Sequence, residues 1–222
     1  MVISLYKNAK DLSNQVNKNK LFDFCHCQSI NTGELPKKNS EFLTIIGSGE
    51  YVKQDIKKWG IHGDIMVVNF VGLFYSLKPD FNHLVSFHCD VFEHIINLRN
   101  LAIRSKPFVT HTFGNINTRI QKHINNINYV WYFKPEPRSS GLLALWIGQA
   151  LGYRKILLLG IPLDNTGRFT DIFNDQDKNL YYEESSIILL QRIDPLKFDN
   201  VRSASGNTAK IFGEPTWPWI QN

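Results

Sequence analysis

The amino-acid sequence predicts an α/β fold: a single Rossmann-like domain with a mostly parallel sheet flanked by helices. The first observation is that short apolar runs of strand length alternate with longer segments of helical pattern along most of the chain. The second is that most of these short runs are continuously apolar, which is typical of parallel strands that helices cover on both faces. The composition agrees, because 43% hydrophobic and 20% charged residues are enough for the core of one folded domain.

Two segments divide the chain. Residues 1–40 are polar and irregular, which predicts an N-terminal arm or a short preceding element. Residues 41–222 then form the Rossmann-like domain. It opens with "EFLTIIGSGEYV", in which an apolar strand leads through a Gly-x-Gly turn into a helix that runs to Lys58.

The next elements follow from the same apolar patterns. Residues 63–72 and 83–90 are further apolar strands, and the second of them ends in a carboxylate. In residues 91–103 the apolar side chains recur near one stripe, which predicts a helix. Residues 106–113 and 128–135 predict two more short strands.

The most regular stretch lies in the second half of the chain. Residues 141–151 form an apolar helical segment that follows Ser139-Ser140 and ends before a glycine, residue types that begin and end helices. Residues 155–160 are an almost wholly apolar strand, and 180–193 predict a late helix. The tail is aromatic and contains proline, and we expect Trp217-Pro218-Trp219 to pack back on the domain. The alternative is an exposed aromatic patch for a carbohydrate, a partner or a membrane.

Charge and cysteine content narrow the class of protein. The formal charge of +5 and the pI of about 9.0 favour an anionic ligand. No run of five or more like charges occurs, so we expect no nucleic-acid partner. Three cysteines are an odd number, too few for a disulfide framework, and fit a reducing compartment. Without a signal-peptide core or an apolar run of roughly 18 residues, the sequence predicts a cytoplasmic protein with no transmembrane segment.

Polar residues gather where the predicted strands end, which is where parallel sheets bind ligands. Gly47-Ser48-Gly49 stands between a strand and a helix, where glycines let the backbone approach a phosphate and helix-start amides face the anion. The alternative is a plain tight turn. Asn69 closes the next strand, and its amide is suited to a ribose or a base edge, or to capping the following helix.

Arg138-Ser139-Ser140-Gly141 leads into the helix at 141–151. A helix N-terminus carries unsatisfied N–H groups and a partial positive charge. We therefore expect Ser140 to cap the helix or to bind a phosphate oxygen, and Arg138 adds a guanidinium whose geometry matches phosphate. The alternative is an ordinary serine cap beside an exposed arginine.

Three residues near strand ends are candidate catalytic bases: Asp90, His111 and Asp164. The alternatives are a packing histidine and turn-forming aspartates. Cys25-His26-Cys27 and His88-Cys89-Asp90 contain residue types that bind metals. The Cys-x-Cys spacing of the first is not that of a zinc site, however, and Cys89 in the second fits a core position, so we predict no metal.

The segments "TIIGSGEYV", "MVVNF" and "SSGLLALWIGQALGYRKILLLGIPLDNTGRF" occur in this order. The arrangement resembles the bacterial lipooligosaccharide sialyltransferases of glycosyltransferase family 42 and the related 6-hydroxymethylpterin diphosphokinase-like proteins. In both groups a Gly-x-Gly-type turn follows the first strand, and a Ser-Gly opens a helix before a strand that ends in Gly-Ile/Met-Asp. The resemblance covers about residues 42–169 discontinuously and is densest at 139–161.

The resemblance implies a nucleotide site. In the sialyltransferases these elements hold the cytidine nucleotide of CMP-sialic acid. Carried over, Gly47-Ser48-Gly49 would approach the nucleotide, and Asn69 matches an asparagine that contacts the nucleotide-sugar. Ser140-Gly141 matches the Ser-Gly at the donor phosphate, and Arg138 falls near the acceptor-side arginine.

The sequence departs from the family at the end of the strand at 155–160. It reads Gly160-Ile161-Pro162-Leu163-Asp164 where the sialyltransferases have Gly-Ile-Asp-Phe-Tyr. Their phosphate-binding tyrosines fall at Asp164 and near Thr170, and no histidine follows His123 to match their catalytic one.

The expected function is that of a glycosyltransferase-like protein that binds a nucleotide-sugar of the CMP-sialic acid type and transfers the sugar to a glycan hydroxyl. The expected partners are therefore a nucleotide-sugar and a glycan acceptor, with no cofactor. One alternative is a non-catalytic nucleotide- or glycan-binding protein on the same fold. The other is a Mg²⁺-dependent pterin diphosphokinase-like enzyme, in which Asp90 would be an acidic residue of the metal site.

Overall fold

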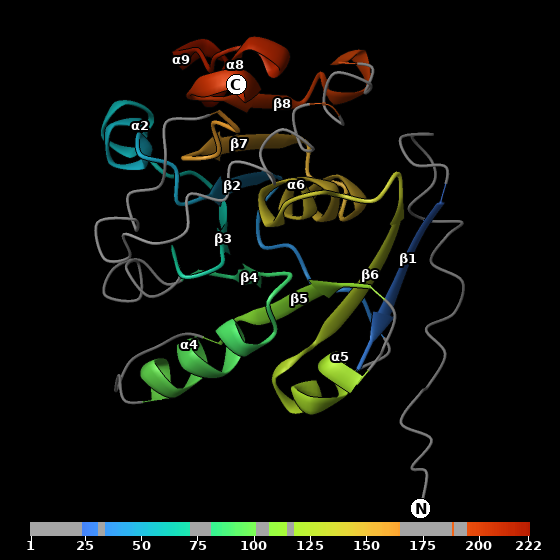
Figure 1. Ribbon diagram of the computed structural model, residues 1–222. Coiled ribbons are helices and arrows are strands. Elements are labelled where there is room, and N and C mark those ends of the chain that lie inside the picture. The colour runs from blue at the N-terminus through green and yellow to red at the C-terminus, as the bar shows by residue number, and fades with distance from the viewer. Residues whose placement is uncertain are drawn as a thin grey trace, which may run out of the picture.

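A computed structural model describes residues 24–30, 34–71, 81–100, 107–114, 118–164, 188 and 195–222. Within these ranges the chain forms one α/β domain around a central sheet (Figure 1). The helix predicted at 180–193 lies outside the described residues, apart from Ile188.

The described residues form an eight-stranded sheet in the order β1-β6-β5-β4-β3-β2-β7-β8. All neighbouring strands are parallel except β1, which runs antiparallel to β6. The predicted α/β class with a mostly parallel sheet is thus confirmed. The strands are β1 (Phe24–Ser29), β2 (Phe42–Ile46), β3 (Asp64–Val68), β4 (His83–Val85), β5 (Val109–Phe113), β6 (Tyr129–Lys134), β7 (Lys155–Leu159) and β8 (Val201–Ser203).

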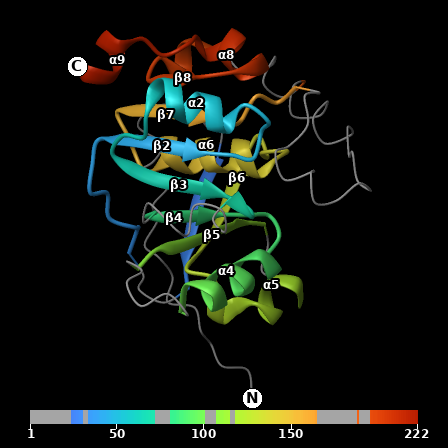
Figure 2. The same ribbon diagram turned by 90° about the vertical axis from the view of Figure 1, so that its left-hand side faces the viewer.

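Helices cover both faces of the sheet, as the continuous apolar strands require. One face packs against α2, α4 and α5, and the other against α6 and α8 (Figures 1 and 2). The helices are α2 (Val52–Trp59), α4 (Asp90–Asn100), α5 (Thr118–Lys122), α6 (Ser140–Ala150), α8 (Gly206–Phe212) and α9 (Trp217–Gln221), with short 3-10 turns η2 (Ile124–Asn126) and η4 (Pro195–Phe198).

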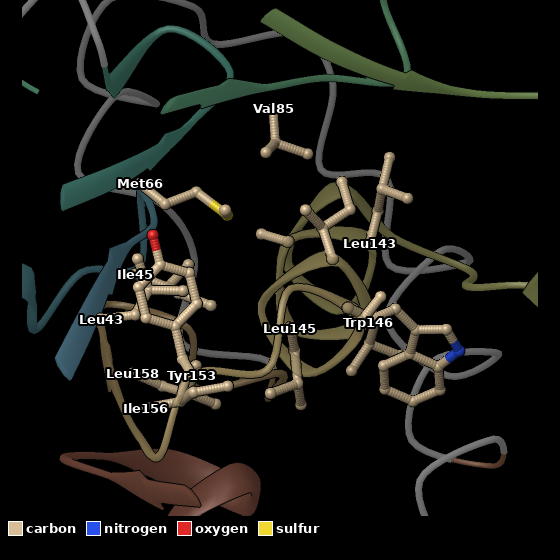
Figure 3. Packing of buried hydrophobic residues seen from close by; sticks show 14 of the residues in the cluster. Leu43, Ile45, Met66, Val85, Leu143, Leu145, Trp146, Tyr153, Ile156 and Leu158 are labelled. Atoms are coloured by element: carbon tan, nitrogen blue, oxygen red, sulfur yellow. The ribbon is translucent and has the colours of Figure 1, made fainter. Parts of the chain in front are cut away.

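Helix α6 is the centre of the larger core. Every residue of this helix except Gly141 is buried, so it has no polar face to offer to solvent. Figure 3 shows Met66, Val85 and Leu143 facing one another between the sheet and the helix, with Leu158 on the β7 side. A helix that is apolar all round is expected at such a central position.

The two ends of the sheet differ from the sequence expectation. Phe24–Ser29, within the segment interpreted as an arm or preceding element, is the edge strand β1. Val201–Ser203, within the predicted tail, is the edge strand β8. Three residues with an arginine in the middle carry no readable apolar pattern, so pairing with β7 rather than local propensity makes this segment a strand.

The strand order reverses beside β2. From β2 the chain adds β3, β4, β5 and β6 on one side, and then returns to place β7 and β8 on the other. The carboxyl ends of the parallel strands, which we call the carboxyl edge, therefore have their switch point between β2 and β7, where such sheets bind ligands. Within the described ranges, no helix is both long and apolar enough to cross a bilayer.

Candidate functional site

The loops that follow β2 and β7 are bonded to each other at the switch point. The backbone N–H of Gly47 donates to the carbonyl of Leu159 at 2.8 Å, and that of Gly49 donates to the carbonyl of Gly160 at 2.8 Å. We call Gly47–Gly49 and Gly160–Pro162 the loop pair. It places the Gly-x-Gly turn at the carboxyl edge, with Ser48 as its partly exposed residue.

Steric crowding explains why this turn needs glycines. A Cβ on Gly47 would lie 2.5 Å from the carbonyl oxygen of Gly160, and one on Gly49 would lie 2.4 Å from Cδ of Pro162. A Cβ on Gly206, at the start of α8, would lie 2.3 Å from Cβ of Pro162. The proline is therefore wedged between two glycines, and it is buried rather than presented to a ligand.

Asp55, on α2, holds the loop pair in place by hydrogen bonding. Its buried carboxylate accepts hydrogen bonds from the Gly160 N–H and the Ser205 hydroxyl, both at 2.9 Å. Burial raises the pKa of Asp55, and the hydrogen bonds from Gly160 and Ser205 oppose that shift. One carboxylate thus joins α2 to the loops that follow β7 and β8.

Asn69 stands at the end of β3 with a backbone φ of 53°, in the left-handed region that asparagine tolerates better than most residues. Its side-chain oxygen accepts a 2.7 Å hydrogen bond from the hydroxyl of Ser86, at the end of β4. The N–H of the next residue, Phe87, donates to the hydroxyl oxygen of Ser140 at 3.2 Å. The loop after β4 therefore brings Asn69 and the start of α6 to one place on the carboxyl edge.

Ser139 and Ser140, at the start of α6, have different roles. Ser139 is the N-cap: its hydroxyl accepts from the Leu142 N–H at 3.2 Å and its carbonyl from the Leu143 N–H at 2.9 Å. Ser140 is buried and holds the β4 loop instead. Among the described residues, the N–H groups of Ser140 and Gly141 find no acceptor, so they remain donors at a positive helix end. Arg138, two residues before the helix start, is exposed.

Two of the candidate bases lie at the carboxyl edge. Asp90 is exposed and is the first residue of α4, directly after the β4 loop. Asp164 follows the loop pair, is half-buried, and comes after Leu163, whose φ of 46° is also left-handed. Asp90 thus follows the loop that bonds Asn69 and the start of α6, and Asp164 follows the loop pair, whose Ile161 lies beside Gly141 at that helix start.

The third candidate, His111, is placed elsewhere. It lies in the middle of β5 with no exposed surface, among the core residues beneath α6. Its ring contacts His83, Trp131 and a stacked Tyr129 at 5.2 Å. The structure therefore does not bring His111 together with Asp90 and Asp164.

His111 belongs instead to a buried chain of hydrogen bonds across four strands, which we call the polar chain. Its four strand residues, Asp64, His83, His111 and Trp131, lie on one face of the sheet, each two positions further along its strand than the residue aligned with the one before. Tyr153, in the connection before β7, links His83 to Asp64. The links are Trp131 Nε1 to His111 Nδ1 (3.1 Å), His111 Nε2 to His83 Nδ1 (3.1 Å), His83 Nε2 to Tyr153 Oη (3.1 Å) and Tyr153 Oη to Asp64 Oδ2 (2.8 Å).

The residues at the two ends of the polar chain determine which atom donates in each of its hydrogen bonds. The indole N–H of Trp131 only donates, so Nδ1 of His111 must be the acceptor and its Nε2 must carry the proton. The same reasoning leaves His83 with its proton on Nε2, donating to Tyr153, which donates to the Asp64 carboxylate. Both histidines are thus neutral, and burial lowers the pKa of His83 to about 4 and that of His111 well below its usual value.

Sequence patterns missed the residues that hold the site together. Ser86, Asp55 and Tyr153 act through contacts to residues that are distant in sequence, and local patterns do not identify such contacts. A polar residue inside an otherwise apolar run, such as the serine in "HLVSFHCD", is the one available signal. Such a residue indicates that its buried side chain needs a hydrogen-bond partner, but it does not identify that partner.

The cysteines are core residues. Cys25, Cys27 and Cys89 are buried and belong to no disulfide, and burial raises the pKa of Cys25 to about 12. In the part of the chain that the structure describes, no group of three or more His, Cys, Asp or Glu side chains is arranged to hold a metal ion.

Comparison with solved structures finds proteins of similar fold. A mutant form of the α-2,3/8-sialyltransferase CstII matches with a TM-score of 0.54 and 15% identity, over 79% of this chain and 87% of the other. An α-2,3-sialyltransferase from Campylobacter jejuni in apo form matches with a TM-score of 0.52 and 18% identity, over 84% of this chain and 83% of the other. Models of protein families and curated proteins gave no match. At these identities the likeness is one of fold, and this chain has a sialyltransferase-like fold.

Proposed function

We propose that this protein is a glycosyltransferase of the sialyltransferase type, akin to glycosyltransferase family 42, which binds a nucleotide-sugar such as CMP-sialic acid at the carboxyl edge. The observation that carries the proposal is the meeting of the loop pair, Asn69 and the start of α6 at the switch point of the sheet. The fold shared with two sialyltransferases, one of them from Campylobacter jejuni, supports it. Three buried cysteines outside any disulfide fit the reducing cytoplasm as its location.

In the proposed site, donors surround the position of the nucleotide phosphate. The N–H groups of Ser140 and Gly141 and the exposed guanidinium of Arg138 are the positive groups of this part of the edge. Together they would stabilise the negative charge that develops on the leaving phosphate. The partly exposed Ser48 lies on the neighbouring loop pair, within the stretch assigned to the nucleotide.

The proposed reaction is a displacement at the anomeric carbon of the donor sugar. The acceptor hydroxyl oxygen forms the new bond to that carbon, and the bond to the phosphate oxygen breaks with its electron pair leaving on the nucleotide. Asp90 or Asp164 takes the proton of the acceptor hydroxyl. We favour these two over His111, because a base must reach the acceptor and His111 has no exposed surface.

Nucleotide titration tests the proposal. CMP, CTP and UDP are titrated against the wild-type protein and against Arg138→Gln. Arg154→Gln is the matched control, because Arg154 is an exposed arginine at the opposite edge of the sheet, before β7. We expect a cytidine nucleotide to bind, about tenfold more weakly to Arg138→Gln and unchanged to Arg154→Gln.

Two results would contradict the proposal. If no nucleotide binds to the wild-type protein, the nucleotide site does not exist. If both arginine variants lose affinity equally, the effect is one of net charge and the carboxyl edge is not the site.

A non-catalytic nucleotide-binding protein is the second candidate, and Pro162 favours it. This residue stands where the related enzymes carry an aspartate, and it is buried between Gly49 and Gly206. Its carbonyl accepts from the N–H of Asn207 at 2.8 Å, so the position serves packing. Nucleotide binding without transfer or hydrolysis across a panel of nucleotide-sugars would support this candidate, and turnover would reject it.

A further inference from the structure

We infer that Ser86 is a positioning residue, whose hydroxyl turns the Asn69 side chain so that the amide nitrogen faces the ligand at the carboxyl edge. The inference rests on the proposed function, because it concerns the same site. It identifies what that part of the site recognises: an oxygen that accepts hydrogen bonds, as on the phosphate of a nucleotide.

The backbones of the two residues are held before their side chains meet. The Asn69 N–H donates to the carbonyl of Val85 at 2.9 Å, and the Ser86 N–H donates to the carbonyl of His111 at 3.1 Å. These bonds continue the pairing of β3 with β4 and of β4 with β5 beyond the strand ends. The left-handed φ of Asn69 then turns the chain away from the sheet at that point.

Hydrogen-bond accounting fixes the orientation of the Asn69 amide. The Ser86 hydroxyl has no exposed surface, and its oxygen already accepts from the His88 N–H at 2.8 Å. Its single proton therefore needs an acceptor, and within the described residues that acceptor is Oδ1 of Asn69, at 2.7 Å. A reversed amide would place an N–H₂ group against the hydroxyl and leave the buried proton without a partner.

The consequence is that Nδ2 of Asn69 is directed away from Ser86 with both of its hydrogens. Among the described residues no acceptor for this nitrogen is found, and the side chain is partly exposed. The loop that carries Ser86 also bonds the start of α6, where the N–H groups of Ser140 and Gly141 are donors without acceptors. Donors from two elements thus face a shared place, which selects for an oxygen-rich anion.

Three variants and one matched control test this inference. Ser86→Ala removes the hydroxyl that holds the amide, and Ser86→Thr retains it. Asn69→Asp keeps an oxygen for Ser86 but replaces the N–H₂ group by a second oxygen. Ser203→Ala is the control, because Ser203 is also fully buried at a strand end and its hydroxyl bonds Thr208 at 2.7 Å, remote from Asn69.

The readouts are the Kd for CMP and the side-chain amide signals of Asn69 in ¹⁵N NMR spectra of the unliganded protein. We expect Ser86→Ala to shift the amide signals and to weaken CMP binding about tenfold, and Asn69→Asp to weaken it at least as much. Ser86→Thr should restore the wild-type amide signals, and Ser203→Ala should bind CMP within about twofold of wild type.

Unchanged amide signals in Ser86→Ala would overturn the inference, as would equal CMP affinity in Ser86→Ala and wild type. If the wild-type protein binds no CMP, the proposed function is wrong, and the amide signals alone then test whether Ser86 orients Asn69. Signals that move in Ser86→Ala and return in Ser86→Thr still establish that Ser86 orients Asn69.

Discussion

At the scale of single residues, the polar chain shows how a buried polar side chain gains a defined chemical state from its partners. Trp131 can only donate and Asp64, at the other end, accepts, so the two histidines between them have one arrangement that satisfies every link. A proton added to either histidine would face an N–H group that already donates to it. The polar chain therefore holds four strands together only while both rings are neutral.

This predicts that acid destabilises the fold through the histidine pair. In the unfolded chain a histidine has a pKa near 6.5, whereas burial lowers the pKa of His83 to about 4 and lowers that of His111 as well. Below pH 6.5 the unfolded chain therefore binds more protons than the folded one. Above pH 6.5 the two histidines do not lower the free energy of unfolding. As the pH drops from 6.5 toward 4, that free energy falls by up to about 1.4 kcal/mol per pH unit for each histidine. The other charged groups near this chain are Glu41 and Lys38, beside Tyr153.

Urea unfolding between pH 4 and pH 7 measures this dependence. His111→Gln keeps a donor and an acceptor on the side chain but removes the titration, and we expect a shallower pH dependence than in wild type. His94→Gln is the control, because His94 is exposed on α4 and should leave the slope unchanged. Equal slopes in wild type and His111→Gln would show that the buried pair does not control acid stability.

At the scale of elements, the loop pair shows two connections built to fit each other. The Gly-x-Gly turn after β2 bonds the backbone after β7, and Pro162 fills the space that the side chains of Gly49 and Gly206 would need. The glycines are thus explained by packing at the switch point. Since the same packing brings Ser48 to the carboxyl edge, it also supports the proposed site.

A double-mutant cycle tests this fit. Gly49→Ala should cost about 2–3 kcal/mol of unfolding free energy, because its Cβ would meet Cδ and Cγ of Pro162. Pro162→Ala removes both of those atoms, so we expect the double variant to recover part of the loss. Gly206→Ala meets Cβ, Cα and the carbonyl oxygen of Pro162, which alanine retains, and should show no such recovery. Chemical denaturation of the six proteins decides, and recovery in both cycles would refute the proposed contact.

At the scale of the whole molecule, the C-terminal residues complete the sheet and then cover its β2–β7–β8 edge. After β8 and α8, the chain places Trp219 against Phe42 of β2, with ring centroids 5.5 Å apart, and its carbonyl accepts from Lys155 of β7 at 2.7 Å. Trp217 contacts Trp59, with ring centroids 5.8 Å apart, but is 50% exposed. The predicted packing of the tail thus depends on the second tryptophan.

The two tryptophans therefore differ in their expected contribution to stability. Trp219→Ala should lower the free energy of unfolding by about 2–3 kcal/mol, because it removes packing on two strands. Trp217→Ala should cost less than about 1 kcal/mol, since half of its surface stays in water. Thermal and urea unfolding of the two variants provide the comparison. A larger loss for Trp217→Ala would mean that the tail packs differently.

Much of this architecture was predictable because continuous apolar runs and helix signals are local. The strands at 42–46, 64–68 and 155–159 and the helix at 140–150 follow from such runs, and so does the class of a mostly parallel sheet. The order of motifs along the chain also predicted which strand ends would carry polar groups. These features can be predicted from the sequence because each depends on neighbouring residues and on the burial that every strand of such a sheet requires.

Only the tertiary structure decided which polar residues act together. It separated Ser139, a helix cap, from Ser140, which bonds the β4 loop, although the two are adjacent. It placed His111 in the polar chain and left Asp90 and Asp164 at the carboxyl edge. It also paired Ser86 with Asn69 and Asp55 with Gly160 across long stretches of chain. Such contacts depend on strand order and register, which the apolar pattern of a single strand does not encode, because every buried parallel strand presents the same pattern.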